Sequence, residues 1–136
     1  MGDESIEGVL NDLADTDSGS RAPTQEQWRQ HLEAPEGPFV VVNLLNIKDE
    51  AALNQYAATA VPAVQSLGAE LIYMGRGGDT LIGDASDSCD VVSVWRWPSR
   101  QAWTDLWLDP DYAAIRPLFN QGVERYRCLV TTEISR

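Results

Sequence analysis

The stretch Phe39–Ile47, with the sequence FVVVNLLNI, decides the fold. Both of its alternating sets of side chains are apolar and rich in β-branched residues, which is typical of a central strand covered on both faces. The expected strands are 39–47, 69–76, 89–97 and 123–134, and the expected core helices lie within 49–67 and 99–122, the second being interrupted at Asp109–Pro110. This order predicts an α+β fold with a ferredoxin-like βαββαβ core and a four-stranded antiparallel sheet.

The chain before this core is predicted as a separate acidic arm. Residues 1–23 combine a weak helical pattern with the linker-like stretch 16–20, so we expect an arm that is flexible or loosely helical. Residues 24–136 are expected to form one domain that begins with a short helix at 24–33, where Thr24 and Gln27 make a capping-box pattern.

The charge of the chain excludes two classes of partner. Its net charge is −11, with 21 acidic against 10 basic side chains and no basic cluster. Such a surface repels phosphate backbones and anionic lipids, so we expect no nucleic acid and no membrane as partner. No apolar run reaches the ~20 residues of a membrane span, and the acidic N-terminus is unlike a signal peptide, so we expect a cytoplasmic protein.

The second face of the sheet predicts a homodimer. The helices of a βαββαβ core cover one face only, yet the strand 39–47 is apolar on both faces. Exposing the other face to water would cost about 25 cal/mol per Å² of apolar surface, which is large against the stability of a domain. Sheet-to-sheet packing of a second copy removes this cost. The alternative is that residues 1–38 cover this face within a monomer.

Three stretches of the chain resemble a known family. They are Gly37–Leu45 (GPFVVVNLL), Asp90–Val92 followed by Trp97–Arg100 (WPSR), and Asp109–Tyr112 (DPDY) followed by Arg116. In these the chain is similar to the domain-of-unknown-function 1330 family of the dimeric α+β-barrel superfamily.

The resemblance covers Thr24 to Thr132 and implies a dimeric α+β-barrel domain over 24–136. It also implies pockets between the sheet and the helices. The family has no settled activity, and its superfamily includes cofactor-free monooxygenases, polyketide cyclases, lactone isomerases and haem-binding enzymes. Fold analogy does not choose among these chemistries.

Three polar residues are predicted as catalytic. Tyr112 and Arg116 lie four residues apart on one helical face, so a phenol and a guanidinium would converge. Asn43 lies on a strand face with apolar neighbours, and a buried amide without a partner costs about 1–3 kcal/mol. Asn43 therefore either bonds to a neighbouring strand or orients a ligand carbonyl.

A second set is predicted to bind the substrate. Trp95, Trp97, Trp103 and Trp107 stand close together in the sequence, and they fill the core or line a pocket for a flat or apolar molecule. The predicted substrate-binding residues are Tyr56, Arg76, Trp95, Trp103 and Trp107. Arg125 and Arg127 are expected to form ion pairs at an edge of the sheet or of the dimer.

The sequence lacks most of the residues that histidine-based catalysis or metal binding would require. His31 is the only histidine and lies ahead of the core, so we expect a surface residue, with a pocket base or a haem ligand as alternatives. No HExxH, CxxC or multi-histidine set is present, so we expect no metal and no cofactor. Cys89 and Cys128 are expected to remain reduced.

The leading hypothesis is a cofactor-independent enzyme, of isomerase, cyclase or monooxygenase type, acting on a small aromatic or carbonyl-bearing metabolite. In this hypothesis Asn43 and Arg116 stabilise an oxyanion or enolate, and Tyr112 handles the proton. The alternatives are a non-catalytic binding or carrier protein with the same cavity, and a structural dimer without activity.

Overall fold

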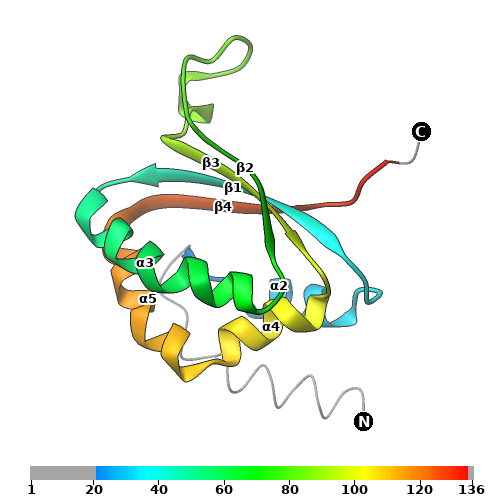
Figure 1. Ribbon diagram of the computed structural model, residues 1–136. Coiled ribbons are helices and arrows are strands. Elements are labelled where there is room, and N and C mark those ends of the chain that lie inside the picture. Colours follow the sequence, from blue (N-terminus) through cyan, green and yellow to red (C-terminus); the bar gives the residue numbers. More distant parts are fainter. Residues whose placement is uncertain (1–20, 135–136) are drawn as a thin grey trace.

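The structure is a computed structural model that describes residues 21–134 and consists of a sheet with a layer of helices beneath it (Figure 1). The strands are β1 Phe39–Ile47, β2 Glu70–Arg76, β3 Val91–Trp97 and β4 Val123–Thr131. The helices are α2 Gln25–Glu33, α3 Glu50–Ser66, α4 Arg100–Leu108 and α5 Pro110–Gly122, with a short 3-10 turn, η3, at Ala85–Asp87. The sheet order is β2-β3-β1-β4, and every neighbouring pair is antiparallel. The predicted α+β fold is confirmed.

β1 is a central strand, and its helix-facing side chains start the core. Phe39, Val41 and Leu45 alternate along β1 and are buried. Opposite Phe39 and Val41 lie Trp97 and Trp95 of β3, which are also buried. This face of the sheet therefore presents large aromatic side chains to the helices.

Each core helix begins where the sequence places a cap. The side chains of Asp49, Ser99 and Asp109 each accept a hydrogen bond from a backbone N–H two or three residues later. Pro110 follows Asp109 in the first turn of α5, where its missing N–H costs nothing. These caps determine where each helix starts and hence which side chains turn toward the sheet.

α3 and α5 approach each other closely at Gly122. A Cβ atom there would lie 2.8 Å from the backbone nitrogen of Leu53 and 3.0 Å from the carbonyl oxygen of Asp49. The Gly122 carbonyl also accepts hydrogen bonds from the N–H groups of Lys48 (2.9 Å) and Asp49 (3.2 Å). The end of β1, the start of α3 and the end of α5 thus meet at one point, and β4 begins at the next residue, Val123.

Replacing Gly122 with alanine should therefore destabilise the fold, because the new methyl group would meet backbone atoms. We expect the free energy of unfolding in urea to fall by about 1–3 kcal/mol. Gly78→Ala is the matched control, since a Cβ atom at Gly78 would meet nothing within 4 Å. Equal stability of the two variants would contradict the close approach of the helices.

α2 packs on the helix side of the molecule, against α4. The ring centroids of Trp28 and Trp103 are 5.0 Å apart. His31 Nε2 lies 3.0 Å from the Arg100 carbonyl oxygen and 3.1 Å from Thr104 Oγ1, and Arg100 Nη1 lies 3.2 Å from His31 Nδ1. His31 is only 8% exposed, so the predicted surface position is wrong. Its partners come from a distant helix, which a local helical pattern does not reveal.

The buried His31 makes stability depend on pH. Burial lowers its pKa; the hydrogen bond to the Arg100 carbonyl opposes this shift, and the positive charge of Arg100 adds to it. Below the unfolded value of about 6.5 the unfolded chain binds a proton more readily than the folded one, so stability falls with falling pH. We expect a loss of up to about 1.4 kcal/mol per pH unit, measured by urea unfolding between pH 7.5 and pH 5.5.

His31→Gln is the matched variant, because it keeps a side-chain N–H without a titrating ring. Its stability should change less over the same pH range. Parallel pH profiles for wild type and variant would show that His31 is not the titrating group.

No described helix lies on the opposite, outer face of the sheet (Figure 1). There Val42 of β1 stands opposite Val94 of β3 and Leu129 of β4, and Leu129 and Tyr73 are 51% and 56% exposed. Because α2 packs on the helix side, residues 21–38 do not cover this face. Residues 1–20 of the predicted arm lie outside the described residues.

Arg125 and Arg127 point to this outer face, where they bind neutral oxygens. Arg125 Nη1 donates to the carbonyl oxygen of Ser86 (2.8 Å), and Arg127 Nη2 donates to Asn46 Oδ1 (3.1 Å). Asn46 Nδ2 in turn donates to the carbonyl oxygen of Ser88 (3.2 Å). Within residues 21–134 neither arginine has a carboxylate partner, so the predicted ion pairs at the edge of the sheet are not formed, while ion pairs at an edge of the dimer stay a prediction. The bonds from Arg125 and Asn46 fasten the loop that precedes β3.

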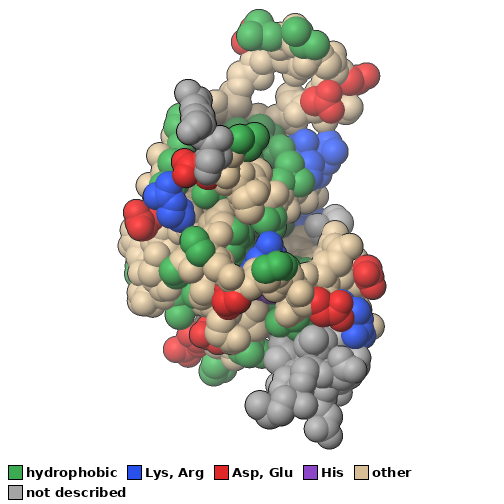
Figure 2. All heavy atoms as spheres, turned by 90° about the vertical axis from the view of Figure 1, so that its right-hand side faces the viewer, with side chains coloured by type: hydrophobic (Ala, Val, Ile, Leu, Met, Phe, Trp, Pro, Cys, Tyr) green, Lys and Arg blue, Asp and Glu red, His purple; other side chains and the backbone are tan. Residues whose placement is uncertain are grey.

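That loop, residues 77–90, stands away from the rest of the molecule (Figure 2). Its tip carries Leu81 and Ile82, which are 92% and 96% exposed. It starts at Gly77, where a Cβ atom would overlap the Cys89 carbonyl oxygen. The segment between β2 and β3 is therefore a long loop that is held at its base.

Candidate functional site

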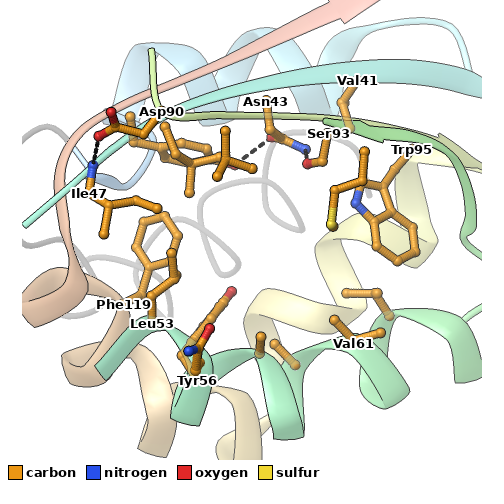
Figure 3. Close-up of a pocket in the computed structure, with 18 of the residues that line it drawn as sticks. Val41, Asn43, Ile47, Leu53, Tyr56, Val61, Asp90, Ser93, Trp95 and Phe119 are labelled. Atoms are coloured by element: carbon orange, nitrogen blue, oxygen red, sulfur yellow. Dashed lines mark hydrogen bonds between the residues drawn. The ribbon is translucent and has the colours of Figure 1, made fainter. Parts of the chain in front are cut away.

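A cavity of about 860 Å³ lies between the sheet and the helices α3, α4 and α5 (Figure 3). Figure 3 shows Asn43, Ser93 and Trp95 on the sheet above this space, and Tyr56 and Val61 on α3 below it. All eight predicted site residues line the cavity: Asn43, Tyr56, Arg76, Trp95, Trp103, Trp107, Tyr112 and Arg116. The fold thus brings them around one space, while the roles assigned to them stay predictions.

Two phenols meet inside the cavity. The hydroxyl oxygen of Tyr56, on α3, is 2.7 Å from that of Tyr112, on α5. One hydroxyl donates to the other, so the pair retains one O–H that can be donated to a ligand. Burial raises the pKa of Tyr56 well above its ordinary value, the neighbouring Tyr112 raises it further, and the charge of Arg116 opposes the shift. Tyr56 is therefore uncharged at neutral pH.

Arg116 is a buried cation on the same helix as Tyr112. Its Nη2 donates to the carbonyl oxygen of Arg21 (2.6 Å), and its Cζ lies 4.5 Å from the Trp107 ring centroid and 4.7 Å from that of Phe119. Its Nε is buried and makes no hydrogen bond. No carboxylate of the described chain forms an ion pair with it. The predicted convergence of phenol and guanidinium is observed, with Tyr56 as a further member.

Asn43 takes part in a hydrogen-bonded chain along the sheet. The Tyr126 hydroxyl donates to Asn43 Oδ1 (2.7 Å), and Asn43 Nδ2 donates to Ser93 Oγ (3.3 Å). Two roles were open for Asn43, a hydrogen bond to a neighbouring strand or the orientation of a ligand carbonyl. The structure shows hydrogen bonds to both neighbouring strands. Burial raises the pKa of Tyr126 well above its ordinary value, and Cys128 adds to the shift, so Tyr126 too is an uncharged donor.

The tryptophans form one wall of the cavity. Trp103 and Trp107 of α4 have ring centroids 5.6 Å apart. Behind them Trp28 of α2 lies 5.0 Å from Trp103 and 5.7 Å from Trp107. Trp95 on the sheet is 8% exposed and lines the same space. These indoles therefore fill the core and shape the cavity at the same time.

The charged lining residues other than Arg116 gather at the opposite end, where β1 ends and the loop 77–90 begins. They are Lys48, Glu50, Arg76 and Asp90. Asp90 Oδ2 accepts a hydrogen bond from the Ile47 N–H (2.7 Å), which fixes its side chain. The cavity is thus polar at one end and aromatic at the other.

Sequence reasoning missed Tyr126, Ser93 and Phe119. Tyr126 stands between Arg125 and Arg127 in the sequence, so strand alternation alone turns it to the face opposite theirs. Asn43 and Ser93 are register partners of β1 and β3, and this pairing depends on the strand offset, which the sequence does not state. A period-of-two reading of β4 could have found Tyr126.

The part of the chain that the structure describes has neither a metal-binding cluster nor a membrane-spanning helix. Residues 21–134 contain no group of three or more His, Cys, Asp or Glu side chains arranged to hold a metal ion. Within the same range, no helix has both the length and the apolar character needed to cross a bilayer.

Comparison with known proteins places the chain beside proteins without an assigned activity. A family model described as domain of unknown function (DUF1330) matches residues 38–132. The crystal structure of RPA0582, a protein of unknown function from Rhodopseudomonas palustris, is 23% identical, with a TM-score of 0.80 over 88% of this chain and 100% of that chain. The methylated RPA0582 protein is 23% identical, with a TM-score of 0.78 over 84% and 94%. No curated protein matches this chain.

Proposed function

We propose a function from the cavity itself, because the chain belongs to the domain of unknown function (DUF1330) family, a description that assigns no activity. The chain acts as a cofactor-independent enzyme on a small aromatic or carbonyl-bearing molecule, in a reaction of isomerase, cyclase or monooxygenase type. The observation that carries the proposal is the hydroxyl pair of Tyr56 and Tyr112, 2.7 Å apart in a largely aromatic cavity.

The size of the cavity supports small-molecule binding. Ligand sites typically enclose about 300–1,000 Å³, lined by apolar side chains with a few polar groups that fix orientation. The cavity here holds about 860 Å³ and has that composition. A dimer whose tryptophans only fill space would not need such a cavity.

The polar groups are suited to stabilising negative charge. The three reaction types pass through an enolate or a related oxyanion, and donors already aimed at that oxygen lower the barrier. The Tyr56–Tyr112 pair offers one O–H to such an oxygen, and Arg116 adds a positive charge nearby. Tyr112 holds the proton that the reaction moves. Asn43 positions Tyr126, because its amide oxygen accepts the hydrogen bond of the Tyr126 hydroxyl while its Nδ2 donates to Ser93.

Removing one hydroxyl of the pair tests this function. We expect Tyr56→Phe and Tyr112→Phe each to lower kcat/KM by about 10²–10³, the usual effect of losing one oxyanion donor. The assay is mass-spectrometric consumption of keto acids, lactones and aromatic carbonyl compounds, followed by kinetics on the substrate found. Tyr73→Phe is the control, because Tyr73 lies on the outer face and does not line the cavity.

Unchanged kinetics in both cavity variants would remove the phenol pair from the mechanism. Fold integrity is checked by unfolding in urea, where loss of a single hydrogen bond should cost about 1 kcal/mol.

A non-catalytic binding protein is the second candidate, and the position of the acidic groups favours it. The carboxylates of the lining, Glu50 and Asp90, lie at the polar end of the cavity, where β1 ends. No carboxylate base is therefore found beside the phenol pair among the described lining residues. A carrier would return its ligand unchanged after incubation, and this outcome separates it from an enzyme.

We also propose that the chain is a homodimer joined through the outer faces of two sheets. Val42, Val94 and Leu129 form an apolar patch there, beyond the reach of any described helix. Burying such a surface against a second copy stabilises it by about 25 cal/mol per Å². A two-fold interface uses the same patch on both copies, so one surface is sufficient.

The dimer is tested by light scattering of the purified protein at micromolar concentration. Leu129→Glu should convert a dimer into a monomer, because it places a charge in the centre of the patch in both copies. Leu108→Glu, at the exposed end of α4, changes a similarly exposed leucine on another surface and should leave the dimer intact. A monomeric wild type would contradict the interface.

A further inference from the structure

Arg116 is a buried cation for which the described chain supplies no anion. It is 4% exposed, its Nη2 donates to the backbone carbonyl of Arg21, it interacts with the Tyr56 side chain closely enough to lower the pKa of that phenol, and its Nε has no partner. A buried charge is costly unless it is paired and its hydrogen-bonding groups are satisfied. A guanidinium has five N–H donors, and the Nε–H of Arg116 is buried without an acceptor.

The aromatic rings around Arg116 orient it without neutralising it. Its Cζ lies 4.5 Å from the Trp107 ring, 4.7 Å from the Phe119 ring and 5.9 Å from the Tyr112 ring. Such contacts stabilise a cation in part and restrict the guanidinium to one orientation. They provide no lone pairs in the plane of its N–H groups, which a carboxylate would provide.

Arg116 lies where a ligand can reach it. It lines the cavity, and it is close enough to Tyr56 for its charge to affect the pKa of that phenol. The other charged lining residues belong to the polar end near Ile47, while Arg116 is surrounded by Tyr56, Tyr112 and Trp107. An anion held there would pack between aromatic faces and touch the phenol pair.

We infer that the ligand of this cavity is a flat carboxylic acid, bound through its carboxylate to Arg116, with a carbonyl or hydroxyl oxygen next to the carboxylate facing the Tyr56–Tyr112 pair. This inference rests on the proposed small-molecule function and names its substrate class. The planar guanidinium matches a carboxylate and supplies the charge, whereas the phenols bind a neighbouring oxygen. The tryptophan wall then covers the flat body of the molecule.

The inference is tested with two probes that share one shape, 2-naphthoate and 2-naphthamide, by isothermal titration of the full chain. Wild-type protein should bind the carboxylate at least about tenfold more tightly than the neutral amide. Arg116→Gln should remove this preference by weakening naphthoate alone. Arg125→Gln is the control, because it removes an arginine from the outer face, away from the cavity.

Each result decides the question. Equal binding of both probes by wild type, or a preference that survives in Arg116→Gln, overturns the carboxylate assignment and leaves the small-molecule function standing. Binding of neither probe overturns both. If Arg116→Gln does not fold, the wild-type comparison still decides, and Arg116→Lys, which keeps the charge, should retain part of the preference.

Discussion

β1 is hydrogen-bonded along both edges, to β3 and to β4, and the rest of the structure depends on this position. Two ladders fix which of its side chains turn toward the helices, and Val41 and Asn43 lie on that face with Trp95 and Ser93 beside them. The helices must cover this face because it is apolar, and its aromatic side chains pack with those of the helices at one end of the sheet. A cavity lies between the two layers.

The cost of burying polar groups explains how the cavity is arranged. Tyr56 and Tyr112 are hydrogen-bonded to one another, and Asn43 is hydrogen-bonded to both Tyr126 and Ser93. The hydrogen bonds of these groups are made within the protein, so they stiffen the walls of the cavity. Arg116 differs, because its charged group contacts aromatic rings and one backbone carbonyl but no carboxylate of the described chain. The charge of a ligand would therefore affect binding most strongly at Arg116.

The order of elements could be predicted because each carries a local signal, such as the two-sided apolar pattern of Phe39–Ile47 or the caps at Asp49 and Ser99. The site could be predicted in part for the same reason. The spacing of Tyr112 and Arg116 is a property of one helix, so their convergence followed from the sequence.

Contacts between distant elements could not be obtained in this way. The sequence predicts a surface position for His31, because nothing near it in the chain indicates Thr104 or Arg100 as partners. The sequence predicts an ion pair for Arg125 at an edge of the sheet or of the dimer, and within one chain Arg125 instead binds a backbone carbonyl of the loop 77–90. The Asn43–Ser93 pair depends on strand register, which only the folded sheet defines.

The junction of α5 and β4 restricts how this architecture can change length. α5 ends at Gly122 and β4 begins at the next residue, Val123, without a linker. The Gly122 carbonyl also accepts hydrogen bonds from the turn that joins β1 to α3. An inserted or deleted residue here would rotate α5 about its axis and turn Arg116 out of the aromatic cluster, while shifting β4 against β1. A change in chain length should therefore be tolerated far better within 77–90, a loop that borders the polar end of the cavity, than at this junction.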